Sequence, residues 1–142
     1  MGDTVLVAFD GSPLSRRALA YALRKCPDDD LVVLHVVDPV YAVYAAELRG
    51  PVDAGAWASG VQGESDRLLA EAESIAADHV GDMTTATATG KPERRILDAV
   101  DDYDVDHVVM GSHGRTGVSR LVMGSTAEAV MRHAPVPVTV VR

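Results

Sequence analysis

Residues 107–126 read HVVMGSHGRTGVSRLVMGST. The first four residues are mostly apolar and contain two valines, which is typical of a strand buried on both faces of a parallel sheet. A segment that contains several glycines follows, and the small polar residues after Gly124 are those that open a helix. The stretch therefore predicts a strand, a glycine-bearing loop and a helix in succession, which is a building unit of α/β folds.

The same alternation of strands and helices extends through the rest of the chain. Short apolar or β-prone runs predict strands over residues 4–9, 31–37, 83–89, 107–110 and 136–141. Amphipathic stretches predict helices over 13–26, 62–80, 92–103 and 124–134. Because parallel neighbours need helical crossovers, we expect an α/β fold with a five-stranded parallel, doubly wound, Rossmann-like sheet. Its expected order is 3-2-1-4-5, with helices on both faces and residues 1–142 in one domain.

The predicted helices have recognisable starts and inner faces. Ser12 is expected to cap the first helix, with Pro13 at its first position. The inner face of helix 62–80 is predicted to contain Leu68, Ala72, Ile75 and Ala76, and that of helix 124–134 to contain Ala127, Val130, Met131 and Ala134. Residues 38–61 hold several glycines and prolines and predict a long loop, with a short helix over 41–48.

The glycine-bearing loop carries the clearest chemical signal. Its spacing from Gly111 to Ser125 is G-x2-G-x9-G-S. Glycines let the backbone approach a ligand closely, and a helix start offers free N–H groups and partial positive charge. With the hydroxyls of Ser125 and Thr126 and the charge of Arg115, these groups predict a site for phosphate oxygens. The alternative is that the glycines only shape a surface loop.

A second signal lies at the end of the first predicted strand. In the expected strand order, Asp10 and Gly111 end the two strands that flank the switch point, where doubly wound sheets bind ligands. Asp10 is interpreted as an acceptor for ribose hydroxyls, with a turn or capping role as the alternative. His113 lies in the glycine loop and is expected to contact the ligand. His35 is interpreted as a packing residue near the site.

The chain resembles a known family. The segments VLVAFDGSP, VVLHVVD, MGSHGRTGVSRLVMGS and HAPVPVTVVR are similar to segments of universal stress proteins, in the same order, between Val5 and Arg142. The full G-x2-G-x9-G-[ST] pattern resembles the branch of that family that binds ATP. The resemblance implies ATP as the ligand, alone or with Mg²⁺, and a homodimer paired through Val136–Val141.

The resemblance also implies roles for individual residues. Adenine and ribose would be lined by Ala8, Asp10 and Val36. Ribose and phosphates would be held by Gly111, Gly114, Arg115, Gly117, Gly124, Ser125 and Thr126, with His113 beside them. Neither a catalytic residue nor a metal ligand is assigned, and the aspartates of residues 101–106 are interpreted as solvated acid.

Composition restricts the class of partner. The formal net charge is −8, which argues against binding to nucleic acid or to anionic lipid. Of the 21 acidic residues 15 are Asp, and Lys25 and Lys91 are the only lysines. We hypothesise adaptation to a salty cytoplasm, in which screening relieves self-repulsion. An ordinary acidic cytosolic protein is the alternative.

Three functions remain after these exclusions. The lone Cys26, the lack of a signal-peptide pattern and the lack of a long apolar run predict a cytoplasmic protein. No P-loop pattern is present. The leading hypothesis is an ATP-binding stress-response protein that acts as a nucleotide-dependent sensor or regulatory module. The alternatives are a slow ATPase or phosphotransferase, and a dimeric interaction protein that binds no nucleotide.

Overall fold

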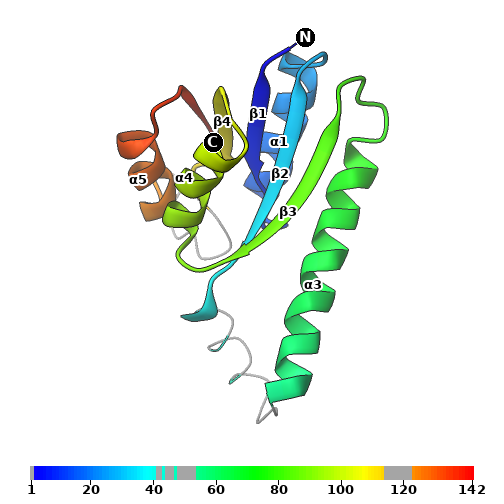
Figure 1. Ribbon diagram of the computed structural model, residues 1–142, viewed down its shortest axis with the longest axis vertical. Helices are drawn as coiled ribbons and strands as arrows, with labels where there is room; N and C mark the ends of the chain where they lie inside the picture. The colour runs from blue at the N-terminus through cyan, green and yellow to red at the C-terminus, as the bar shows by residue number, and fades with distance from the viewer. Residues whose placement is uncertain (1, 41–42, 44–46, 48–53, 114–122) are drawn as a thin grey trace.

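Five parallel strands form one sheet in the order β3-β2-β1-β4-β5, as the sequence predicted. The computed structural model describes residues 2–40, 43, 47, 54–113 and 123–142 (Figure 1). Along the chain the elements are β1 (Thr4–Ala8), α1 (Pro13–Lys25), β2 (Asp30–Val37), α3 (Ala54–Ile75), β3 (Met83–Thr89), α4 (Pro92–Asp102), β4 (His107–Gly111), α5 (Ser125–His133) and β5 (Val138–Val141). Within these residues, no helix has the length and apolar character needed to cross a membrane.

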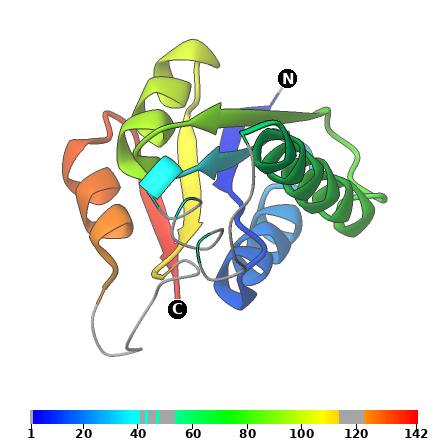
Figure 2. The same cartoon turned by 90° about the horizontal axis from the view of Figure 1, so that it is seen from below.

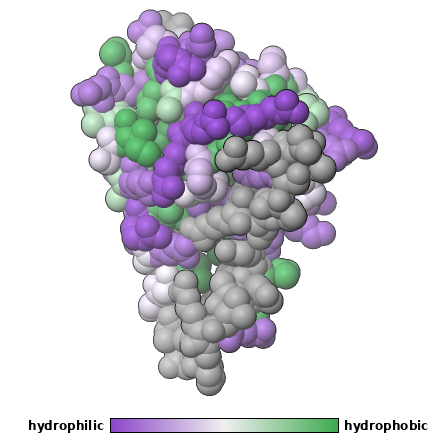
Figure 3. Space-filling view, turned by 180° about the vertical axis from the view of Figure 1, so that it is seen from behind, coloured by the Kyte–Doolittle hydropathy of each residue, from purple (hydrophilic) through white to green (hydrophobic). Residues whose placement is uncertain are grey.

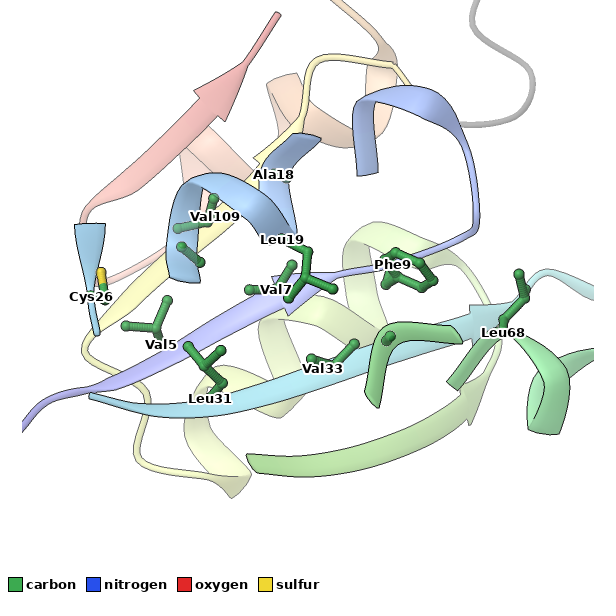
Figure 4. Packing of buried hydrophobic residues seen from close by; sticks show 12 residues of the cluster. Val5, Val7, Phe9, Ala18, Leu19, Cys26, Leu31, Val33, Leu68 and Val109 are labelled. Atoms are coloured by element: carbon green, nitrogen blue, oxygen red, sulfur yellow. The ribbon is translucent and has the colours of Figure 1, made fainter. Parts of the chain in front are cut away.

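Helices cover both faces of the sheet. Seen from below, α1 and α3 lie on one side of the sheet and α4 and α5 on the other (Figure 2). Side chains that are neighbours along a strand point to opposite faces, so β1 contributes to two separate cores. Val5, Val7 and Phe9 pack against α1 and α3, as Figure 4 shows. Leu6 packs toward α4 and α5, with the partly buried Ala8 beside it.

The turn between β1 and α1 follows the sequence prediction. The hydroxyl oxygen of Ser12 accepts the backbone N–H of Ser15 at 3.2 Å, and Pro13 occupies the first helical position. Both features stabilise a helix start, because they satisfy one orphan N–H and remove the need to satisfy another. The start of α1 is therefore fixed close to the end of β1.

Helix α3 departs most from the prediction. It begins at Ala54 instead of residue 62, because Ala54, Ala56 and Ala58 favour helix strongly enough to carry it through Gly60. It ends at Ile75 instead of residue 80, where the chain turns and the His79 ring lies 2.7 Å from the carbonyl oxygen of Asp29. Of the short helix expected over 41–48, only Val43 and Glu47 are described, and both are helical.

Two expected core residues lie outside the core. Ile75 is 39% exposed because the buried side of α3 runs through Leu68 and Ala72 and continues to Ala76 in the turn after the helix. Met131 is 47% exposed. It belongs to α5, which packs on the edge strand β5 and on α4, so one flank of this helix has no described element beside it. The limits of β3 are as predicted, and those of the other four strands differ from the prediction by one or two residues.

Candidate functional site

The carboxyl ends of β1 and β4 lie side by side at the centre of the sheet. Val7 pairs with Val109, so the residues that follow each strand emerge next to one another. The chain leaves β1 toward α1 on one face and leaves β4 toward α5 on the other, which makes this edge the topological switch point. Figure 2 looks onto this edge of the sheet. Ligands of doubly wound folds bind at such a point.

Asp10 forms the turn that leaves β1. Its Oδ1 accepts the backbone N–H of Ser12 at 2.9 Å, and Gly11 between them has a φ of 79°, a value that favours glycine. Asp10 therefore has the turn role that the sequence analysis gave as the alternative to ribose contact. A carboxylate can accept several hydrogen bonds, so this role is compatible with contact to a ribose. Ala8 is the last residue of β1 and Val36 the last but one of β2, so both lie toward the carboxyl edge of the sheet.

Gly111 ends β4 directly beneath the first turn of α1. A Cβ at this position would meet the Cβ of Leu14 at 2.8 Å, which real Cβ contacts essentially never show. The glycine is therefore explained by helix packing, whether or not a ligand binds. Because glycine has no side chain, the end of β4 and the start of α1 can approach each other closely.

Gly124 joins the start of α5 to the end of β4. Its N–H donates to the carbonyl oxygen of Ser112 at 2.7 Å, and a Cβ at Gly124 would lie 2.8 Å from the same oxygen. Ser112 is itself held to the sheet, because its N–H donates to the carbonyl oxygen of Val141 at 2.8 Å. The N-terminus of α5 is thus fixed at the carboxyl edge of the sheet. Nothing in the sequence marks Ser112 for this role.

The N-terminus of α5 has no side-chain cap from its N-cap residue. Gly124 is the N-cap and makes no side-chain capping bond, so the N–H groups of Ser125, Thr126 and Ala127 are not capped by it. Glu128, the acidic residue of this turn, pairs with Arg132 at 2.9 Å one turn further on. An uncapped helix start carries partial positive charge and offers N–H groups to an anion.

The structure places eight of the eleven sequence-predicted site residues. Ala8, Asp10, Val36, Gly111, His113, Gly124, Ser125 and Thr126 all lie at or next to the carboxyl ends of β1, β2 and β4 or at the start of α5. The Nδ1 of His113 lies 3.1 Å from the Ser112 hydroxyl oxygen. Gly114, Arg115 and Gly117 lie outside the described residues.

A separate hollow of about 400 Å³ lies between β3 and α4. Its walls include Arg95, Asp98, Asp101, Asp102 and Tyr103, and none of the predicted site residues lines it. Three carboxylates make it a poor site for a phosphate, so it does not compete with the switch point as the anion site. Among the described residues, no group of three His, Cys, Asp or Glu side chains comes close enough to hold a metal ion.

Solved structures share this fold. Universal stress protein UspA from Lactobacillus plantarum superposes with a TM-score of 0.76 at 24% identity, covering 99% of this chain and 97% of that one. A universal stress protein in complex with cAMP gives 0.72 at 21% identity, covering 99% and 97%. A family protein from Arabidopsis thaliana with AMP bound gives 0.70 at 18% identity, covering 98% and 90%. At these identities the likeness shows the fold.

Sequence comparison shows the family. Universal stress protein YxiE from Bacillus subtilis is 31% identical over 149 residues, which cover 100% of both chains. A universal stress protein from Thermus aquaticus is 32% identical over 144 residues, again covering 100% of both. The model of the universal stress protein family matches residues 1–142. With its fold and its whole length in agreement, the chain belongs to the universal stress protein family.

Proposed function

We propose that this chain binds ATP at the carboxyl edge of its sheet and acts, as one domain, as a nucleotide-dependent sensor or regulatory module. The observation that carries the proposal is the start of α5, where Gly124 supplies no side-chain cap and the bond from its N–H to Ser112 O holds the helix at the switch point. The chain as a whole is acidic, so an anion needs local positive potential of this kind to bind.

The residues present fit an adenine nucleotide. The N–H groups of Ser125 and Thr126, with the two hydroxyls, suit phosphate oxygens, and the loop residues Gly114, Arg115 and Gly117 are proposed to complete this end. The carboxylate of Asp10 suits ribose hydroxyls. Ala8 and Val36 supply apolar surface for adenine. The proposal is further supported by related structures of the same fold, one in complex with cAMP and one with AMP bound.

The edge strand β5 offers a surface for assembly with a second copy of the chain. β5 is an edge strand whose four residues are half-buried, so it can pair with the same strand of a second copy across a two-fold axis. We propose a homodimer through Val136–Val141 on this ground. Cys26 is a free, buried thiol, which fits a reducing cytoplasm.

The first test isolates the backbone donor at the start of α5. Ser125→Pro removes both the N–H and the hydroxyl of the first helical residue, whereas Ser125→Ala removes only the hydroxyl. Proline is well tolerated there, because Gly124 has φ −65° and ψ 154°, which a residue before proline can adopt. We expect Ser125→Pro to weaken ATP binding about tenfold relative to Ser125→Ala in calorimetric titration, since a charge-assisted bond is lost.

Titration with ATP and Mg²⁺, ATP alone, AMP and cAMP, in molar KCl, identifies the preferred ligand. Saturable binding of ATP that is tighter than binding of AMP, together with a loss in Ser125→Pro, supports the proposal. Saturable binding of AMP or cAMP but not of ATP would keep an adenine-nucleotide site and reject ATP. Absence of heat at several temperatures, from folded protein free of nucleotide, rejects nucleotide binding and leaves a dimeric interaction protein.

A further inference from the structure

His35 is a buried histidine that lies against the backbone of the candidate site. It belongs to β2 and is 6% exposed. Its Nδ1 lies 3.1 Å from the carbonyl oxygen of Phe9. Because a carbonyl oxygen only accepts, Nδ1 must carry the hydrogen and donate it. Phe9 is the residue between the end of β1 and Asp10, so the histidine holds the chain where it leaves the sheet.

Phe9 is held at three points. Its ring is 1% exposed and packs in the core beneath α1 and α3, among the side chains labelled in Figure 4. Its N–H donates to the carbonyl oxygen of Leu34 at 2.9 Å, and its carbonyl oxygen accepts from His35. The pairing register of β1 with β2 ends at Ala8, so this side-chain bond fixes a carbonyl that lies past the ladder.

The fixed carbonyl determines how Asp10 is presented. Asp10 follows Phe9 directly, and on its other side its carboxylate accepts the N–H of Ser12, the N-cap of α1. The peptide group that contains the Phe9 carbonyl oxygen also contains the Asp10 nitrogen, so its orientation fixes the position of the Asp10 Cα, and the bond to Ser12 then limits where the side chain can point. With one end held by β2 and the other by α1, Asp10 has little freedom to rotate away from the edge of the sheet.

We propose that His35 is a positioning residue for the nucleotide site, which acts by donating from Nδ1 to the Phe9 carbonyl and so orients Asp10 toward the ribose. This inference rests on the proposed nucleotide function for its ligand. The binding residue remains Asp10, and His35 acts on it through the backbone of Phe9. A histidine that only fills the core would affect stability but would leave the geometry of the Asp10 turn unchanged.

Two substitutions separate these roles. Asn places its Nδ2 donor at the same number of bonds from the backbone as Nδ1 of histidine, so His35→Asn retains the bond to Phe9. His35→Leu removes it. His107→Leu is the matched control, because this half-buried strand histidine contacts the Thr139 hydroxyl oxygen at 2.7 Å, at the start of β4 and far along the sheet from Asp10.

The first readout is hydrogen exchange of the Ser12 amide, which reports the bond to Asp10 without any ligand. We expect His35→Leu to speed this exchange about tenfold relative to the amide of Val109, since loss of one hydrogen bond opens the turn locally. His35→Asn and His107→Leu should leave the Ser12 rate close to that of the wild type. Equal acceleration at Ser12 and Val109 would mean global destabilisation and would overturn the proposal.

The second readout is ATP affinity, measured by calorimetry on each folded variant. We expect His35→Leu to bind ATP about fivefold to tenfold more weakly, and His35→Asn to restore most of the affinity. Unchanged affinity in His35→Leu would overturn the link to the ligand. If the wild type itself binds no nucleotide, the proposed function fails, and the Ser12 exchange rates still decide whether His35 positions Asp10.

Discussion

A Cβ placed on Gly111 would lie 2.8 Å from the Cβ of Leu14 and 3.1 Å from its carbonyl carbon. The end of β4 and the first turn of α1 are therefore in direct contact, and shortening the Leu14 side chain to alanine would not relieve the clash. We expect Gly111→Ala to lower the free energy of unfolding by about 1–3 kcal/mol, because overpacking forces a backbone shift. Urea unfolding measures this change, and an unfolding midpoint equal to the wild type would contradict the packing.

Gly60 and Gly63 provide the contrasting prediction. Both lie inside α3, and a Cβ on either would meet nothing within 4 Å. Alanine has a better helix propensity than glycine, so each Gly→Ala substitution should raise the free energy of unfolding by about 0.5–1 kcal/mol. The same urea unfolding assay tests them. A loss of stability at both sites would mean that α3 does not extend through residues 60–63 in solution.

Ser65 has a buried hydroxyl that no described residue satisfies. The residue is 1% exposed, and its Oγ has no hydrogen-bond partner within the part of the chain that the structure describes. Burying an unpaired hydroxyl costs free energy, so Ser65→Ala should stabilise the protein by about 1 kcal/mol, and Ser65→Val at the same site should not, since it adds volume. Thermal unfolding of the two variants measures the difference. Destabilisation by Ser65→Ala would show that the hydroxyl has a partner in solution.

Arg16 and Glu71 link α1 to α3. The Nε of Arg16 lies 2.5 Å from Glu71 Oε1, and the hydrogen bond from Arg16 holds the pKa of Glu71 below its usual value of 4.5. A lowered folded-state pKa means that the carboxylate stabilises the fold above that value, and that this contribution is lost as the pH falls through the folded pKa. Glu71→Gln should therefore cost under about 1 kcal/mol near neutral pH, since both side chains are partly solvated.

The pH dependence supplies the check for that pair. The difference in free energy of unfolding between wild type and Glu71→Gln should be constant at neutral pH and should shrink below about pH 4.5. Urea unfolding at a series of pH values measures it. A difference that grew on acidification would contradict a lowered pKa of Glu71. Glu64→Gln is an unsuitable control because Glu64 has an interaction of its own, so Glu73→Gln on the exposed side of α3 serves instead.

The acidic composition leads to a prediction about salt. Hydrophilic side chains cover much of the face shown in Figure 3, with smaller apolar areas between them. With a formal net charge of −8, mutual repulsion should destabilise the fold at low ionic strength. We expect the melting temperature to rise between low and molar KCl, because screening weakens that repulsion. A melting temperature that stays level or falls would favour an ordinary acidic protein.

The fold was predictable because its signals are local. Buried parallel strands such as Val5–Val7 are apolar on both faces, and each helix follows its strand in a crossover pattern that allows few topologies. The limits of α3 were not predictable, since Gly55 and Gly60 are typical of loops and the alanines around them outweigh that signal. The exposure of Ile75 and Met131 depends on which neighbours cover each flank of a helix, which periodicity alone does not specify.

The candidate site was predictable in its place and less so in its causes. The sequence pattern predicts ligand contact at Gly111 and Gly124, and the structure adds a packing reason for each glycine, the contact with Leu14 and the contact with Ser112. Nothing in the sequence marks the bond from His35 to Phe9, because it joins residues 26 positions apart through a ring nitrogen and a carbonyl. Such bonds depend on strand register, which becomes known only from the folded chain.

The packing role of Gly111 changes what a sequence pattern can diagnose. A glycine that the architecture itself requires should be present in chains of this fold that have lost their ligand as well as in those that keep it. A search that scores this glycine as a marker of nucleotide affinity therefore scores a requirement of the fold and not a property of the ligand site. Chains that bind a nucleotide should instead be distinguished at positions that the packing of the fold does not determine. Ser125, on an exposed first helical turn, is one such position.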